Sequence, residues 1–68
     1  MDYIIEVEQE TDGRWIADIA QLPGVMAYGS TRDEAMAKAQ ALALRVEAEK
    51  LENGERPFFE TSLSFKAA

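Results

Sequence analysis

The sequence contains no cysteine and no histidine among its 68 residues. The absence of cysteine excludes a disulfide framework and thiolate metal ligands, and the absence of histidine removes the commonest metal ligand and general base. Zinc fingers and catalysis of the Ser-His or Cys-His type are therefore excluded. Carboxylates are the only serious catalytic candidates that remain, and we expect neither a metal nor another cofactor.

Basic residues and long hydrophobic runs are also scarce. Seven Lys and Arg stand against thirteen Asp and Glu, which gives a net charge of −6 at pH 7. This sign opposes contact with phosphates, so we expect no direct nucleic-acid binding, whereas a basic protein partner is electrostatically favoured. Because no stretch is apolar enough for a signal peptide or a membrane span, a cytoplasmic location is expected, without membrane association.

The length predicts one domain, residues 1–68, near the size at which a single core barely offsets the conformational entropy of folding. Association with a second copy or a partner is therefore a reasonable expectation. Six acidic residues but only one basic residue, Arg14, fall within residues 1–29. This uneven charge indicates either a solubility device or an acidic docking face.

Two strands joined by a tight turn are expected at residues 3–9 and 14–20, which are rich in β-branched and aromatic residues. Asp12-Gly13 between them permits a two-residue turn or a three-residue loop. We favour the three-residue loop, because register follows the segregation of apolar side chains. It pairs Val7 with Ala17 and Ile5 with Ile19, and so gathers on one face Tyr3, Ile5, Val7, Trp15, Ala17 and Ile19. The other face then carries Glu6, Glu8, Ile16 and Asp18.

The stretch LPGVMAYGSTRDEA predicts a corner, a third short strand within residues 25–29 and the start of a helix. Pro23 fixes one backbone dihedral, while Gly24 and Gly29 are expected to permit dihedrals that other residues avoid. Thr31 and Glu34 have the spacing of a capping box. The helix should run from about residue 32 to residue 53 and end at Gly54.

This helix carries two apolar stripes on nearly opposite sides. The first stripe is expected to cover the sheet and consists of Ala35, Met36, Ala39, Leu42, Ala43 and Val46. The second would be left exposed and is our candidate oligomer interface, although it could simply reflect the high helix propensity of alanine. It consists of Ala37, Ala41, Leu44, Ala48 and Leu51.

A last strand is expected to place Phe59, Thr61, Leu63 and Phe65 on one side, with the terminal KAA frayed. A strand-helix-strand crossover is normally right-handed and parallel, so this strand should lie beside the first. The expected fold is α+β: a β-β-β-α-β domain with a four-stranded mixed sheet of order 3-2-1-4 and one long helix packed on one face.

The same order of elements is the core of the ribonuclease H topology, whose enzymes hold two divalent metals with acidic residues. Glu6 or Glu8, Glu34 and Glu60 fall on comparable elements. However, Glu34 is better used as a helix cap, and the first strand lacks a suitable aspartate. We interpret these carboxylates as solvated residues and keep a metal-dependent nuclease as a weak alternative. Trp15 is either a base-stacking platform or a core and interface aromatic, and we favour the second.

Residues 3–50 resemble the HicB family of antitoxins. The family pattern of L-P-G, four residues, G, one residue, T, two residues and E-A is matched by Leu22, Pro23, Gly24, Gly29, Thr31, Glu34 and Ala35. The resemblance implies a degenerate ribonuclease H-like fold without catalytic residues. It also implies a bacterial toxin-antitoxin system, in which the protein neutralises HicA, a small basic mRNA-cleaving toxin, by direct contact.

The longer members of the family carry a C-terminal DNA-binding domain that this sequence does not match, so no DNA binding is implied. Our candidate partner-binding residues are Glu6, Glu8, Trp15 and Asp18, and the oligomer-interface candidates are Ala41, Leu44, Ala48 and Leu51. The alternative function is that of a toxin-independent structural or regulatory protein that forms a homodimer or homotetramer.

Overall fold

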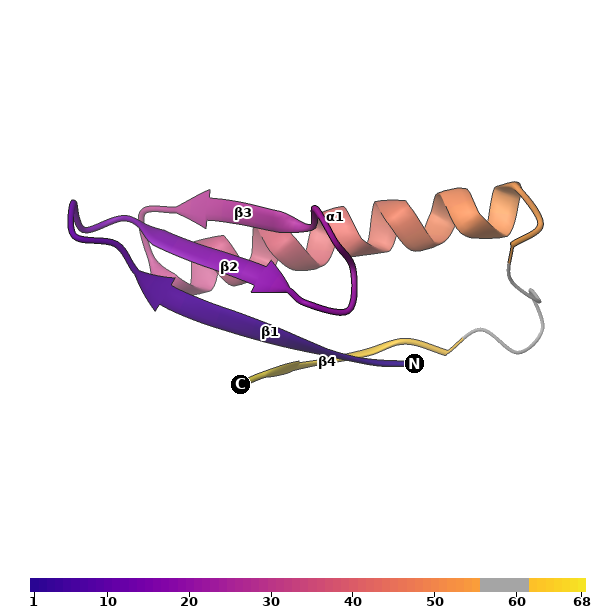
Figure 1. The fold of residues 1–68 in the computed structure, drawn as a ribbon, viewed down its shortest axis with the longest axis horizontal. Helices are drawn as coiled ribbons and strands as arrows, with labels where there is room; N and C mark the ends of the chain where they lie inside the picture. The colour runs from indigo at the N-terminus through magenta and orange to yellow at the C-terminus, as the bar shows by residue number, and fades with distance from the viewer. Residues whose placement is uncertain (56–61) are drawn as a thin grey trace.

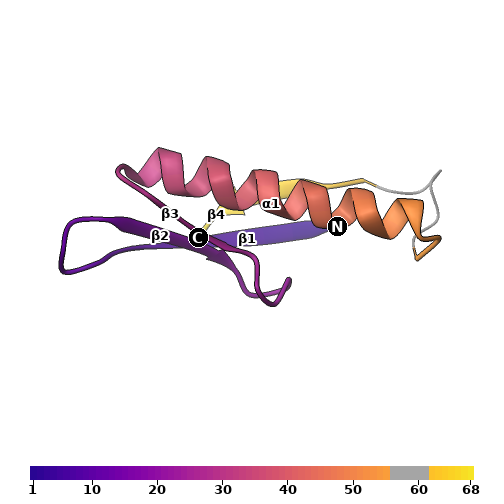
Figure 2. The ribbon, with the colours of Figure 1, turned by 90° about the horizontal axis from the view of Figure 1, so that it is seen from above.

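One sheet and one helix form two layers in the computed structural model, which describes residues 1–55 and 62–68. The elements are β1 (Asp2–Gln9), β2 (Trp15–Ile19), β3 (Met26–Gly29), α1 (Arg32–Glu52) and β4 (Ser64–Ala67). The strand order is β3-β2-β1-β4, with β1 antiparallel to β2 and parallel to β4. The long helix α1 lies along one face of the sheet (Figures 1 and 2) and packs against β1, β2 and β3. The predicted α+β architecture and strand order are confirmed.

The β1–β2 hairpin has the three-residue loop that we favoured. Val7 pairs with Ala17 and Ile5 with Ile19. The backbone N–H of Glu10 donates to the carbonyl of Arg14 at 2.7 Å, and Gly13 adopts a positive φ of 92°. The loop therefore sets the register that buries the apolar side chains.

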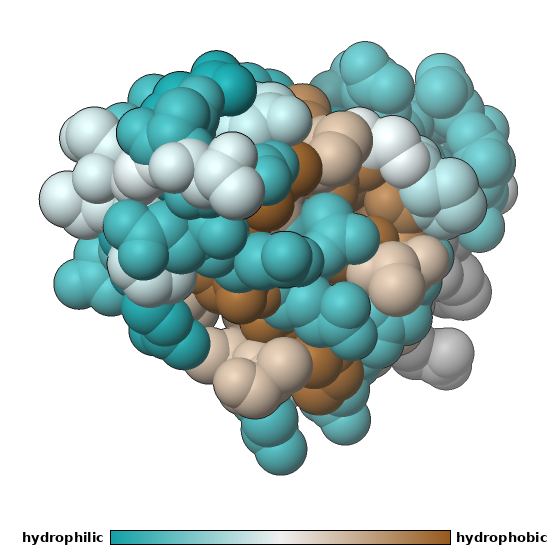
Figure 3. All heavy atoms as spheres, turned by 60° about the vertical axis from the view of Figure 1, so that its left-hand side comes forward, coloured by the Kyte–Doolittle hydropathy of each residue, from teal (hydrophilic) through white to brown (hydrophobic). Residues whose placement is uncertain are grey.

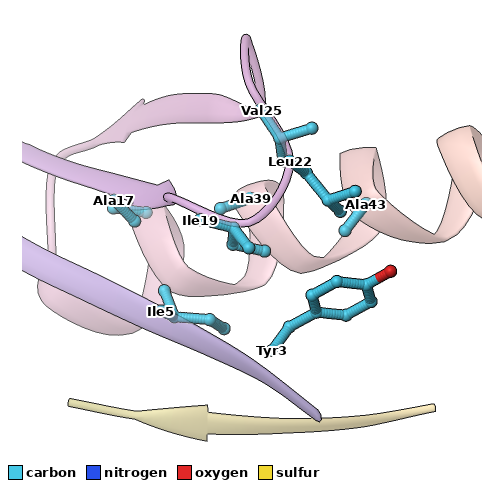
Figure 4. Close-up of a cluster of buried hydrophobic side chains, with 9 residues drawn as sticks. Tyr3, Ile5, Ala17, Ile19, Leu22, Val25, Ala39 and Ala43 are labelled. Atoms are coloured by element: carbon cyan, nitrogen blue, oxygen red, sulfur yellow. The ribbon is translucent and has the colours of Figure 1, made fainter. Parts of the chain in front are cut away.

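The corner between β2 and β3 is a β-turn over residues 22–25. The N–H of Val25 donates to the carbonyl of Leu22 at 3.0 Å, and Gly24 has a φ of 86°. Proline and then a positive-φ glycine at the two central positions are the signature of a type II turn. The turn directs Leu22 and Val25 into the core (Figure 4), where both are buried.

Gly29 does not need an unusual dihedral, so that expectation was wrong. Its φ is not positive, and its role is to allow close approach of the helix. A Cβ atom added there would lie 2.5 Å from the backbone nitrogen of Ala35. Only glycine lets β3 and the first turn of α1 come this close, because any side chain would overlap the helix backbone.

Both ends of α1 are capped as the sequence predicts. The N–H of Glu34 donates to Thr31 Oγ1 at 3.1 Å, and the Glu34 carboxylate accepts from the N–H of Ser30 at 3.1 Å. At the other end Gly54 has a φ of 73°, and the N–H of Glu55 donates to the carbonyl of Lys50 at 2.8 Å. The bonds at the start of the helix form a capping box in which Glu34 accepts from Ser30 and not from the N-cap residue Thr31. Those at its end form a Schellman motif.

The core lies between the sheet and the first stripe of α1. Ala35, Ala39 and Ala43 are fully buried, and Met36, Leu42 and Val46 pack beside them. Because the residues of the first stripe that lie nearest the sheet are alanines, the helix can lie close to the buried side chains of β1 and β2, which include Tyr3, Ile5, Ala17 and Ile19 (Figure 4).

The end of the chain pairs with β1 instead of fraying. Lys66 and Ala67 belong to β4, and the N–H of Ala68 donates to the carbonyl of Ile5 at 2.9 Å. These bonds hold KAA in place because β1 offers its free edge to a parallel strand. Leu63 and Phe65 pack against the core as expected. Phe59, Thr61 and Glu60 lie outside the described residues.

Candidate protein-binding face

The face of the sheet opposite α1 is not covered by any other described element. Alternate residues of a strand point to opposite faces, so the neighbours of the buried positions project here. We call this surface the open face and define it by Glu6, Glu8, Ile16, Asp18, Met26 and Tyr28. It combines acidic and apolar side chains on three adjacent strands.

Strand register places two acidic residues of the open face directly opposite each other. Glu6 pairs with Asp18 across β1 and β2, while Glu8 pairs with Ile16. Like charges at directly opposed positions destabilise a sheet. Ion pairs among the described residues join Asp12 to Arg14, Glu34 to Lys38 and Glu47 to Lys50. Within the described part of the chain, Glu6, Glu8 and Asp18 therefore form no ion pair.

Apolar side chains flank these carboxylates. Met26 pairs with Asp18 and is 49% exposed, while Tyr28 pairs with Ile16 and is 43% exposed. Large side chains exposed to this extent on adjacent positions mark an interaction surface more often than isolated ones do. Figure 3, which brings the hairpin end of the molecule forward, shows hydrophilic residues over most of the surface and hydrophobic atoms exposed between them.

Two described basic residues lie near the open face: Lys66 of β4 stands at its edge, opposite Ile4, and Arg14 is already engaged. The Arg14 guanidinium carbon lies 4.6 Å from the centre of the Tyr28 ring, and its Nε is 2.8 Å from Asp12 Oδ2. The first contact is a cation–π interaction and the second a surface ion pair. The pKa of Asp12 is held below its ordinary value mainly by the hydrogen bond from the backbone N–H of Arg14, and the Arg14 side chain lowers it further. Because Arg14 is paired with Asp12, it does not neutralise the carboxylates of the open face.

The open face is hollowed along its acidic side. A depression of about 350 Å³ is lined by Glu6, Val7, Glu8, Glu10, Ile16, Asp18 and Met26. A second depression, of about 250 Å³, lies beside the corner at residues 22–25 and shares Asp18 and Met26 with the first. The two together offer a concave, negative strip that a protruding basic side chain could enter.

The structure brings together three of the four partner-binding candidates. Glu6, Glu8 and Asp18 share the open face, whereas Trp15 lies on the other side of the sheet, half-buried against the core. The motif residues have structural positions: Leu22, Gly29 and Ala35 are buried, Pro23 and Gly24 form the corner, and Thr31 and Glu34 cap α1.

The oligomer-interface candidates lie on the side of α1 that faces away from the sheet. Leu44 is 45% exposed and Ala48 is exposed, while Ala41 and Leu51 are half-buried. The second stripe is therefore uncovered along most of its length in the single chain.

Sequence reasoning missed a buried carboxylate, Glu47, which is only 1% exposed. The Tyr3 hydroxyl donates a hydrogen bond to Glu47 Oε1, and Lys50 Nζ lies 3.9 Å from the same oxygen. The four-residue spacing that buries Ala35, Ala39 and Ala43 continues to position 47 and could have revealed it. A buried carboxylate requires such partners, because desolvation of an isolated charge is unfavourable.

No cluster of three or more acidic residues that could hold a metal ion occurs within residues 1–55 and 62–68. Glu34 is used as a cap: the Ser30 N–H, followed by Lys38, lowers the pKa of its carboxyl. Glu60, the third residue of the nuclease alternative, lies outside the described residues. Within the same ranges, no helix is both long and apolar enough to cross a membrane.

The open face, with its three carboxylates and exposed apolar side chains, is our candidate surface for binding another protein. Comparison with protein-family models, curated proteins and solved structures found no match to this chain.

Proposed function

We propose that this chain is a HicB-like antitoxin domain with a partial ribonuclease H-like fold, which binds a small basic HicA-like toxin and has no enzymatic activity of its own. The observation that carries the proposal is the open face, where Glu6 and Asp18 are paired across two strands and form no ion pair among the described residues. The spacing from Leu22 to Ala35 supports the family, and the net charge of −6 supports a basic partner.

The open face gives the proposal a physical basis. Two directly opposed carboxylates repel each other in the free domain, and a Lys or Arg of a partner placed between them removes that repulsion. Met26, Tyr28 and Ile16 around them supply apolar area that a partner would bury. Charges steer association and the apolar contacts slow dissociation, a combination that suits inhibition of a basic nuclease.

Co-expression with the product of a neighbouring small basic open reading frame tests the proposal. We expect the toxin to arrest growth alone, and the two proteins to co-purify and restore growth together. Reversing one charge, in Asp18→Lys, should weaken binding by about tenfold or more, because a close charge pair at an interface is worth at least 1.4 kcal/mol.

Glu49→Lys provides the matched control, since it makes the same charge change at an exposed position of α1. It should leave binding and growth rescue unchanged. Absence of a small basic neighbour, failure of rescue, or equal effects of the two variants would contradict the proposal.

A second candidate function is that of a toxin-independent homo-oligomeric regulatory protein, and the exposure of Leu44 on α1 favours it. Growth rescue separates the two candidates. An oligomer that neither binds the basic neighbour nor rescues growth would favour the second.

A further inference from the structure

The exposed stripe of α1 has the spacing of a coiled-coil seam. Its residues are Ala37, Ala41, Leu44, Ala48 and Leu51, which follow one another at intervals of four, three, four and three. This alternation places all five side chains along one line of an α-helix. A seam of this kind is the pattern by which one helix packs along another.

Size alternates along the seam as well. Alanine occupies positions 41 and 48, and leucine occupies positions 44 and 51. Leu44 is the large apolar side chain of α1 that is most accessible, at 45%. Two such helices fit best when each leucine of one lies against an alanine of the other, because large and small residues then interdigitate without voids.

We propose that two copies of this chain associate through α1 as an antiparallel, two-fold symmetric helix pair. Leu44 then packs against the partner's Ala48, and Leu51 packs against the partner's Ala41. Symmetry repeats each contact, so four alternating layers form. The interface is isologous, as in most homodimers.

The charges beside the seam select the antiparallel direction. Lys38 and Glu52 flank it on the solvent side at opposite ends of the helix, and both are exposed. In the antiparallel pair Lys38 faces the partner's Glu52, and this attraction occurs twice. In a parallel pair Lys38 would face the partner's Asp33, but Glu52 would face the partner's Glu47, so each attraction would be offset by a repulsion between like charges.

Arg45 opposes the antiparallel pairing, and its replacement distinguishes the two helix directions. Arg45 falls beside the two-fold axis in the antiparallel arrangement, where it faces the partner's Arg45. Replacement with glutamine should therefore tighten the dimer. In a parallel pair Arg45 would face the partner's Gln40, and the same replacement would have no effect.

The dimer leaves the proposed toxin-binding surface free. The seam and the open face lie on opposite sides of the two-layer fold, since α1 covers the other face of the sheet (Figure 2). Two open faces are then displayed outward by one dimer. The inference is independent of the toxin, because self-association is measured without it.

Sedimentation equilibrium of the full chain tests self-association directly. We expect a monomer–dimer equilibrium, with Leu44→Glu raising the dissociation constant by at least about tenfold, since burying a leucine is worth more than the 1.4 kcal/mol of one decade. Met26→Gln removes an equally exposed apolar residue from the open face and should change nothing. A strict monomer at millimolar concentration, or equal effects of the two variants, would overturn the proposal.

Charge exchange and cross-linking test the direction. Glu52→Lys should weaken the antiparallel dimer, because it faces the partner's Lys38, whereas it would tighten a parallel pair by facing the partner's Glu47. The double variant Lys38→Glu, Glu52→Lys should restore the antiparallel dimer. The chain has no cysteine of its own, so Leu44→Cys mixed with Ala48→Cys should form a disulfide-linked dimer, whereas neither variant alone should. Efficient cross-linking of Leu44→Cys to itself, or no recovery in the double variant, would overturn the antiparallel arrangement. Circular dichroism of each variant verifies that the helix is retained.

Discussion

The hydroxyl of Tyr3 donates a hydrogen bond to the buried carboxylate of Glu47 and so links the start of β1 to the fifth turn of α1. Both side chains are almost fully enclosed, and the Tyr3 ring lies 5.6 Å from the ring of Phe65 on β4. These contacts join three elements that are distant in the sequence. They lie at the end of the core, where Glu47 follows the buried alanines of α1.

Removing the Tyr3 hydroxyl should destabilise the domain. In Tyr3→Phe the buried Glu47 carboxylate loses a donor, and we expect the free energy of unfolding to fall by about 1 to 3 kcal/mol. Tyr28→Phe removes a hydroxyl from an exposed ring and should change stability by less than about 0.5 kcal/mol. Urea unfolding followed by circular dichroism measures both. Equal stabilities of the two variants would mean that the bond contributes nothing.

Gly29 should tolerate no side chain. The Cβ atom of Gly29→Ala would lie 2.5 Å from the nitrogen and 3.0 Å from the Cα of Ala35, and a backbone neighbour cannot rotate away. We expect a loss at or above the upper end of about 1 to 3 kcal/mol, the range for overpacking. At Gly24 a Cβ would meet nothing within 4 Å, so Gly24→Ala should lose only the roughly 1 to 2 kcal/mol of left-handed strain. Thermal unfolding compares the two, and a smaller effect at Gly29 would contradict this explanation.

Stability should fall in acid partly because of Glu34. The Ser30 N–H, together with Lys38, lowers the pKa of this carboxyl from its ordinary value of 4.5 in the folded state. A group whose pKa is lower when folded stabilises the protein above its unfolded pKa, and this stabilisation is lost as the pH falls through 4.5 and below. The pKa of Asp2, lowered by the Ser64 hydroxyl, acts in the same direction.

Glu34→Gln should therefore flatten the pH dependence of the unfolding midpoint below about pH 5. Glu52→Gln, at an exposed position of the same helix, controls for the loss of one charge. A profile of Glu34→Gln that matches the wild type throughout this range would contradict the role of the cap.

Neutralising one member of the opposed pair on the open face should stabilise the free domain. Glu6→Gln removes repulsion with Asp18, and we expect a gain of about 0.2 to 1 kcal/mol that shrinks at high salt. Glu8→Gln is the matched control, because Glu8 faces Ile16 instead of an acidic residue. Chemical unfolding at low and high NaCl measures the difference. If Glu6→Gln stabilises the domain yet weakens binding to a basic partner, the repulsion is retained for binding.

The sequence by itself determined the elements that depend on local chemistry. Asp12-Gly13 and the apolar pattern specified the hairpin register, Pro23-Gly24 specified the turn, and Thr31 and Gly54 bounded the helix. Each of these features satisfies its backbone hydrogen bonds within a few residues, so neighbouring side chains suffice to predict it. The acidic set Glu6, Glu8 and Asp18 also followed from register alone, since period-two alternation assigns residues to a face.

Only the tertiary structure decided the features that depend on contacts between distant elements. The four-residue spacing of the buried alanines points to position 47, but a glutamate can be buried there only because the Tyr3 hydroxyl from β1 reaches its carboxylate. Likewise, glycine at position 29 suggested a special dihedral, whereas the approach of α1 to β3 is what excludes a side chain. The terminal residues were expected to fray because nothing local holds them, and they are ordered by the free edge of β1. In each case the deciding partner is distant in the sequence, and only the packed fold brings it within reach.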